Sequence, residues 1–293
     1  MLRILVIVGI FAGLSIVASR LQSETNFAFL SWPWENIREQ STASYPMPAS
    51  GVVQISNSSG DVYVTGGAGS TVDVTVKKSA ISRADLDAMS SHVDRADAGL
   101  SITTEYPHHC INCDLSYEIK VPRGARIVAS VESGDVHVTG TSGLINITSA
   151  SGDVRLADDS GAVNVDSSSG DVRLIDVSAA ARVKESSGDI NATGLSNDID
   201  FNTASGDVDA RYTSFAHVGT VRIHDTSGSI VLEVPQNFGA RITASTSSGD
   251  LSSNMKLPIH DHDSGSDVSV SVGSGKTAVD LSASSGDITI NSR

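Results

Sequence analysis

A nine-residue repeat runs through the middle of the chain and constrains its fold more than any other feature. A serine returns every nine residues from Ser133 to Ser205, and every second unit reads Ser-Gly-Asp. The strong Gly-Asp pair recurs every eighteen residues, at Gly134, Gly152, Gly170, Gly188 and Gly206. Each unit reads as one turn and one short strand, so two units make one coil and successive coils stack as parallel strands. The pattern predicts an all-β fold, a parallel β-solenoid of the β-roll or β-helix kind with about 18 residues per coil.

Apolar and polar residues alternate within each unit. In the unit SGDVRL, Val154 and Leu156 fall on one side of the strand and Arg155 falls on the other. The same alternation holds along the array, which predicts a continuous dry core and a polar outer face. Arg155 and Arg173 stand one coil apart on that outer face, and we take them as a candidate binding surface.

Glycine at the turns indicates corners where the backbone takes a positive φ, which a Cβ would penalise. Asn197 stands at one such corner and tolerates that region, whereas Ala179 at another predicts a different turn or some strain. The aspartates that follow the glycines have two interpretations. They can accept hydrogen bonds from turn N–H groups, or they can bind calcium, since carboxylates about 4.8 Å apart repel one another. The known calcium-roll nonapeptide GGxGxDxUx spaces its glycines differently, so we favour the structural role and expect no metal at Asp135, Asp153, Asp171, Asp189 and Asp207.

The repeat starts at residue 50 and is interrupted early. Ser82 is a candidate N-cap for a short helix along ISRADLDAMSSHVDRA, with Leu86, Met89 and Val93 on one stripe. This interruption is expected to cover one end of the solenoid, because an uncovered coil exposes an edge. Coils continue past Gly206 with inserted loops, and Gly286-Asp287 restores the motif near the C-terminus. We therefore predict a single solenoid domain over 50–293 and a linker over 20–49.

Residues 1–19 read as a signal peptide or a membrane anchor. Arg3 precedes an apolar run from Ile4 to Ala18, which is short for a membrane span of about 20 residues. Cleavage and retention both remain open. Either predicts an exported protein in the periplasm, at the cell surface, or anchored in the membrane and facing outside the cytoplasm.

Export places Cys110 and Cys113 in an oxidising compartment, where the motif HHCINC predicts a disulfide between them. With His108 and His109 alongside, the same four residues could instead bind zinc or copper. A second polar cluster of His260, Asp261, His262 and Asp263 follows Pro258 and reads as a solvated loop.

Charge and motifs limit the function classes. The net charge of −14 argues against nucleic acid and anionic membrane surfaces as partners. Gly273 to Thr277 ends like a phosphate-binding loop, but Val270 stands where that motif requires glycine. No GxSxG elbow occurs, so a serine hydrolase is not indicated.

The SGD-V-x-V repeats, the VPRGARI strand at Val121 to Ile127, the helix-bearing interruption and the closing SSGDITI resemble the bacterial putative adhesin family, a β-solenoid domain of unknown function. The resemblance implies an envelope protein, and it carries over no catalytic residue. We expect a non-enzymatic scaffold or binding module without a cofactor, whose partner is a protein or a glycan at the cell envelope. The alternatives are a polysaccharide-active β-helix enzyme, for which 255–266 is the one long loop, and a partner-binding regulator of envelope stress.

Overall fold

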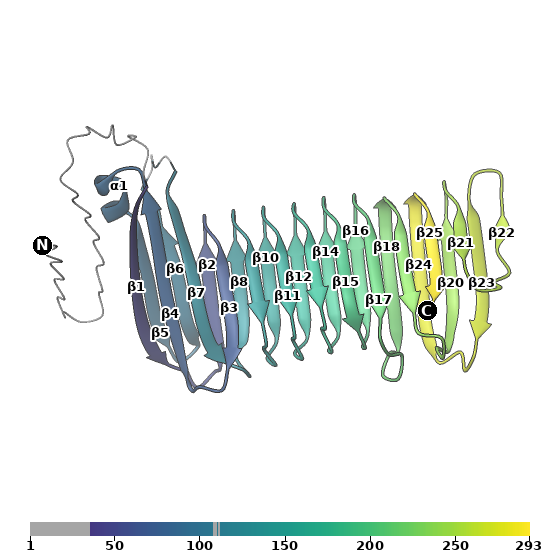
Figure 1. Ribbon diagram of the computed structural model, residues 1–293, viewed down its shortest axis with the longest axis horizontal. Coiled ribbons are helices and arrows are strands. Elements are labelled where there is room, and N and C mark those ends of the chain that lie inside the picture. The colour runs from purple at the N-terminus through teal and green to yellow at the C-terminus, as the bar shows by residue number, and fades with distance from the viewer. Residues whose placement is uncertain (1–35, 108–109, 111) are drawn as a thin grey trace, which may run out of the picture.

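The computed structural model describes residues 36–107, 110 and 112–293, and in this part of the chain the strands form two long sheets that make one rod (Figure 1). Sheet A has 12 strands and sheet B has 13, and one hydrophobic core runs between them. The central array alternates between the sheets. Its sheet A strands are β9 (Val136–Thr139), β11 (Val154–Ala157), β13 (Val172–Ile175), β15 (Ile190–Leu195) and β17 (Val208–Tyr212). Its sheet B strands are β8 (Arg126–Val131), β10 (Ile145–Ser149), β12 (Val163–Ser167), β14 (Ala181–Glu185) and β16 (Ile199–Thr203).

Coils of the array stack in register every eighteen residues. In sheet A, Val154 pairs with Val136 on one side and with Val172 on the other, and both pairings are parallel. Every inward apolar side chain of the array is at most 3% exposed, from Val136 to Ala210. The predicted parallel β-solenoid and its two-faced strands are confirmed.

The Ser-Gly-Asp corners need glycine for two reasons. Gly170 has a φ of +111°, a region that residues with a Cβ rarely adopt. A Cβ at Gly170 would also lie 2.4 Å from the carbonyl oxygen of Gly152 in the preceding coil. These corners behave as the sequence predicts.

The alternate corners differ from the expectation. Gly161 does not have a positive φ; its Cβ would instead meet a backbone carbonyl oxygen of the preceding coil at 1.8 Å. Ala179 and Asn197 follow it in the same column, and neither has a positive φ. The left-handed residues stand three positions before the column, at Asp158 (φ 57°) and Asp176 (φ 53°). The prediction of positive φ at Asn197 is therefore wrong, whereas the different turn expected at Ala179 is present.

The N-terminal end of the rod places its coils out of sequence order (Figure 1). The coil of β2 (Val52–Asn57) and β3 (Val62–Gly67) stacks directly on β8 and β9. The later coil of β6 (Gly99–Glu105) and β7 (Asp114–Pro122) stacks outside it. Antiparallel strands complete the end. β4 (Thr71–Ala80) pairs with β7, β1 (Ile37–Pro46) pairs with β4, and β5 (Ser90–Ala96) pairs with β6. The interruption covers this end, as predicted.

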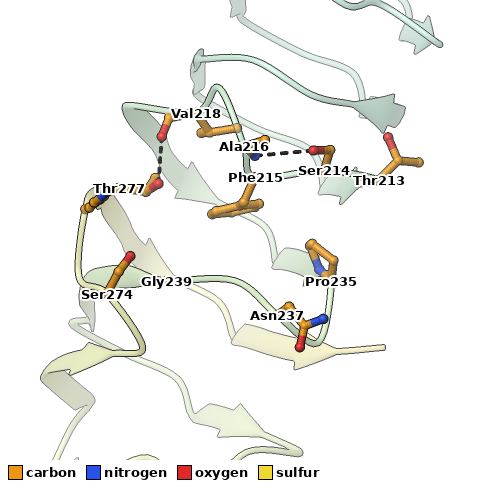
Figure 2. A pocket seen from close by; sticks show the side chains of 11 residues that line it. Thr213, Ser214, Phe215, Ala216, Val218, Pro235, Asn237, Gly239, Ser274 and Thr277 are labelled. Atoms are coloured by element: carbon orange, nitrogen blue, oxygen red, sulfur yellow. Dashed lines mark hydrogen bonds between the residues drawn. The ribbon is translucent and has the colours of Figure 1, made fainter.

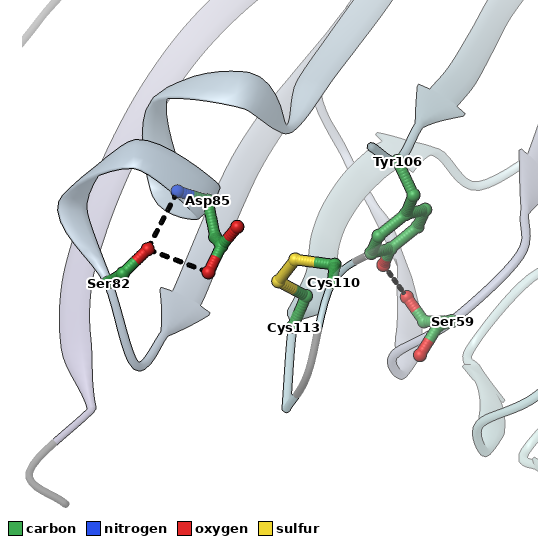
Figure 3. Close-up of a disulfide and its surroundings, with 6 residues drawn as sticks. All are labelled: Ser59, Ser82, Asp85, Tyr106, Cys110 and Cys113. Carbon is green, nitrogen blue, oxygen red and sulfur yellow. Dashed lines mark hydrogen bonds between the residues drawn. A yellow bond between two sulfur atoms is a disulfide. The ribbon is translucent and has the colours of Figure 1, made fainter. Parts of the chain in front are cut away.

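The helix of this region is shorter than the sequence pattern suggests. α1 covers only Arg83–Ala88, with the Ser82 hydroxyl accepting from the Asp85 N–H at 3.1 Å (Figure 3). Leu86 and Met89 are buried, but Val93 lies in strand β5, so the predicted three-residue stripe is wrong. The reason is tertiary: antiparallel pairing with β6 along residues 90–96 overrides a weak helical pattern.

The C-terminal end is also reordered. The chain first forms β18 (Thr220–Ser227) and β19 (Ile230–Val234), then β20 (Ala240–Thr246) and β21 (Leu251–Ser253). The last coil, β24 (Thr277–Ser285) and β25 (Ile288–Ser292), then inserts between these two coils with parallel pairing on both sides. The antiparallel strands β23 (Ser266–Val272) and β22 (His260–Asp261) finish sheet B.

Strand β1 falls inside 20–49, the segment expected to be a linker, and pairs along its whole length with β4. The signal peptide or anchor expected at 1–19 lies outside the described residues. Among the described residues, no helix is long and apolar enough to cross a membrane.

Candidate functional site

The corner aspartates form a hydrogen-bonded ladder along the rod. We use the name aspartate ladder for Asp61, Asp135, Asp153, Asp171, Asp189 and Asp207. In each, Oδ1 accepts the backbone N–H of the corresponding residue in the next coil, at 2.8–3.2 Å. Each carboxylate thus has a donor of its own, which is the structural role that the sequence favours. In the described part of the chain, no group of three or more His, Cys, Asp or Glu is placed to hold a metal ion.

Arg155 and Arg173 are direct neighbours on the outer face of sheet A, as their spacing predicts. Arg173 pairs with Asp171 at 3.1 Å and reaches Asp153 at 3.8 Å, so part of its charge is compensated by the aspartate ladder. The same row continues to His137 and Tyr63, whose rings stack with centroids 4.7 Å apart. Sequence reasoning missed this aromatic pair, because Tyr63 and His137 become neighbours only when β3 stacks on β9.

Cys110 and Cys113 are joined by a disulfide with their Cα atoms 5.7 Å apart (Figure 3). The alternative zinc or copper site also needs His108 and His109, which lie outside the described residues. Beside the disulfide, the Tyr106 hydroxyl donates to the backbone carbonyl of Ser59 (Figure 3). Burial raises the pKa of Tyr106, with a smaller contribution from the charge of Asp114, so this hydroxyl stays a donor at neutral pH.

His260, Asp261, His262 and Asp263 lie on the exposed β22 hairpin and its turn. Asp261 accepts a hydrogen bond from the Ser266 hydroxyl at 2.9 Å, and His262 pairs with Asp267. Both partners belong to the same hairpin, so these side chains are used in fastening it.

A pocket of about 480 Å³ opens where three irregular loops meet at one corner of the rod (Figure 2). The loops are 213–219 between β17 and β18, 235–239 between β19 and β20, and 273–276 between β23 and β24. Asp198 anchors the first loop by accepting the N–H groups of Gly219 at 2.6 Å and Thr220 at 3.0 Å. Thr277 ties the third loop to the first through a 2.6 Å bond to the Val218 carbonyl (Figure 2).

Hydroxyl, amide and ammonium groups surround an apolar floor in this pocket. Phe215 forms the floor, with its ring 4.7 Å from that of Tyr212 and 5.8 Å from that of Phe238. Val218 and Pro235 extend it. The polar lining residues are Thr213, Ser214, Asn237, Ser274, Lys276 and Thr277. The lining contains no carboxylate, imidazole or thiol, so the pocket offers groups for recognition and lacks an acid–base pair.

The sequence did not reveal this pocket, although it singled out Gly273 to Thr277 and set that segment aside as a phosphate loop. Insertion of β24 between β18 and β20 brings the three loops together, and no sequence pattern encodes that insertion. The local signal was the pair Gly273 and Gly275, whose φ angles of +58° and +60° make the tight turn before Lys276.

The outer face of sheet B holds one further charged group with a shifted pKa. Burial acts to raise the pKa of Asp200, but hydrogen bonds from Arg182 and Asn202 and the charges of Arg182 and Arg222 outweigh it. The net pKa of Asp200 therefore lies below its ordinary value. These residues are structural, since Asp200 bridges coils of the array.

Comparison with known proteins gives a family and several solved structures of low sequence identity. The model of the family described as Toastrack DUF4097 matches residues 110–291. No curated protein matches the chain. A solved structure described as a putative adhesin from Bacteroides fragilis is 18% identical, covers 87% of this chain and 97% of its own, and gives a TM-score of 0.49. One described as a putative cell adhesion protein from Clostridium sporogenes is 13% identical, covers 87% and 100%, and gives 0.29.

The family match covers more than half of the 293 residues and includes the whole regular array. The resemblance drawn from the SGD-V-x-V repeats is confirmed. The chain belongs to the Toastrack DUF4097 family.

Proposed function

We propose that this protein is a non-enzymatic binding module of the cell envelope, and that the pocket between loops 213–219, 235–239 and 273–276 holds an anionic saccharide. The composition of the lining carries the proposal: hydroxyl, amide and ammonium groups stand around an aromatic floor, with no acid–base pair among them. Ligand pockets commonly combine an apolar body with a few polar groups that fix orientation.

Lys276 sets the charge of the ligand. It is exposed at the pocket rim, within a chain whose net charge is −14. The net charge opposes anions at long range, but the pocket lining itself holds no carboxylate. The Lys276 ammonium can therefore attract a ligand carboxylate locally by a charge-assisted hydrogen bond. Ser274 and Asn237 can pair with ring hydroxyls, while Phe215 offers an apolar surface to a sugar ring. A uronic acid has all of these groups.

The rod would hold this pocket away from the membrane. Strand β1, which follows residues 1–35, lies at the outer edge of sheet A at the N-terminal end (Figure 1). The pocket lies beyond the regular array, between β17 and β24. If residues 1–19 anchor the chain, the coils between serve as a spacer with a rise of about 4.8 Å each.

Titration calorimetry of the purified exported chain tests the proposal, with tetragalacturonic acid as the acidic probe and maltotetraose as the neutral one. We expect the acidic probe to bind more tightly, and Lys276→Gln to weaken its binding by about tenfold, the loss of roughly 1.4 kcal/mol. Lys256→Gln is the matched control, because Lys256 is exposed outside the pocket.

Two results would contradict the proposal. Absence of binding of both probes, or equal binding to the wild type and the Lys276→Gln variant, would remove the pocket as a saccharide site. Release of shorter products from the acidic probe would show an enzyme, which is the alternative that the β-helix fold leaves open.

A further inference from the structure

Five polar side chains lie inside the core along one corner of the rod. We call Ser149, Ser167, Glu185, Thr203 and Asp225 the corner column. They occupy the same position in five successive strands of sheet B and pair in register. Each is at most 6% exposed, and each has a side-chain oxygen without a hydrogen-bond partner among the described protein atoms. A single unpartnered oxygen is costly when buried, and five in a row require a common explanation.

The column is closed at both ends by apolar residues. Val131 precedes Ser149 in the register and Ala283 follows Asp225, and both are buried. Beyond these two, the column position is polar again and fully bonded. Asn57 donates to the carbonyl of Gly60 at 2.7 Å, and Thr246 donates to that of Gly286 at 2.8 Å. Side chains at this position can therefore reach the corner glycine carbonyls when their length and geometry suit.

When ionised, the two carboxylates of the column have no hydrogen to donate to one another or to a carbonyl. One oxygen of Glu185 accepts the Ser187 N–H at 3.1 Å, and one of Asp225 accepts the Ser227 N–H at 2.9 Å. Their second oxygens are acceptors without a donor. Burial raises the pKa of Asp225, although the Ser227 N–H opposes this. A molecule that donates two hydrogen bonds and accepts others would satisfy carboxylates, hydroxyls and carbonyls alike.

The spacing of the coils suits water. Neighbouring strands lie about 4.8 Å apart, so the hydroxyl oxygens of the paired residues Ser149 and Ser167 are expected at about that spacing. That is too far for a direct hydrogen bond of about 2.8 Å. A water oxygen that makes a hydrogen bond of about 2.8 Å to each of two such oxygens has an angle of about 118° between these two bonds, close to the tetrahedral angle. Buried water in proteins typically makes about three hydrogen bonds to groups that lack other partners.

We propose that an enclosed file of water molecules, about one per coil, runs through the corner column between Val131 and Ala283. The file is part of the native core, and it explains how serine, glutamate, threonine and aspartate can occupy a position that is apolar on both sides of the run.

A crystal structure of the full exported chain at about 1.5 Å resolution or better tests this inference. We expect a discrete density peak within hydrogen-bond distance of each unpartnered oxygen of the column. Ser167→Val should remove the peaks beside position 167 and leave those beside Asp225. Ser168→Val, at the adjacent exposed position, should leave the whole file intact.

Two outcomes would overturn the inference. The wild-type crystal could show the column oxygens bonded directly to protein groups with no density between them, a result that does not depend on any variant. Crystals grown with rubidium chloride in place of sodium salts could show anomalous peaks beside Glu185 or Asp225, which would identify a cation site instead of water.

Discussion

Replacing Phe201 with alanine should lower the free energy of unfolding by about 3–5 kcal/mol. Phe201 is fully buried in β16, between Val183 and Ile223 of the neighbouring coils. The adjacent sheet A strands place Ala192 and Ala210 in the same core, and alanine cannot extend into the space that the ring vacates. Because the coils on both sides are held by continuous backbone ladders, the cavity can collapse little, which favours the upper part of the range.

Urea unfolding followed by circular dichroism measures this loss through the transition midpoint, with the slope expected to stay constant. In thermal melts the same loss corresponds to a melting temperature lower by about 6–20 °C. Tyr63→Ala is the control, because Tyr63 is an aromatic residue on the outer face with 40% of its surface exposed. Equal midpoints for wild type and Phe201→Ala would refute the core register described above.

Four further predictions concern the corners, the disulfide, calcium and acid stability. The Gly170→Val variant should melt well below the wild type, because it places a Cβ at φ +111° and 2.4 Å from a carbonyl oxygen. The Asp171→Asn variant should lower the melting temperature only slightly. A Gly170→Val variant that melts at the same temperature as the wild type would refute the corner geometry. Intact-mass measurement of the exported protein should find two hydrogens fewer than in the reduced form, from a disulfide between Cys110 and Cys113; two free thiols with a stoichiometric metal would favour the metal site. Millimolar calcium should leave the melting temperature nearly unchanged, and a large rise would turn the aspartate ladder into a metal-binding roll. The native pKa of Asp200 lies below its unfolded value of about 3.9, so the ionised Asp200 stabilises the fold fully above about pH 3.9 and loses this effect as the pH falls through the native pKa. The difference in unfolding free energy between wild type and Asp200→Asn should therefore shrink over this acid range. A difference that does not change with pH would contradict the prediction.

The regular array could be predicted from the sequence because each unit carries its own local information. The corner glycine, the aspartate after it and the two apolar residues of the strand recur together, and alternation alone assigns Val154 and Leu156 to the core. The placement of Arg155 beside Arg173 follows from the period in the same way. In these cases a residue and its partner are related by a fixed sequence offset.

The order in which coils stack at the two ends of the rod depends on tertiary structure. Every coil offers nearly the same backbone ladder to both of its sides, so the repeat does not encode which coil stacks on which. Insertion of β24 and β25, the stacking of β3 on β9, and the conversion of residues 90–96 from predicted helix to strand β5 all follow from partners distant in the sequence. The pocket around Phe215 and Lys276 exists only because of that stacking order. The sequence by itself therefore determined the coil and its two faces, through interactions that repeat every eighteen residues. The tertiary structure decided the candidate binding site, because the strand edges of different coils are interchangeable and only the packing of the whole chain selects which of them pair.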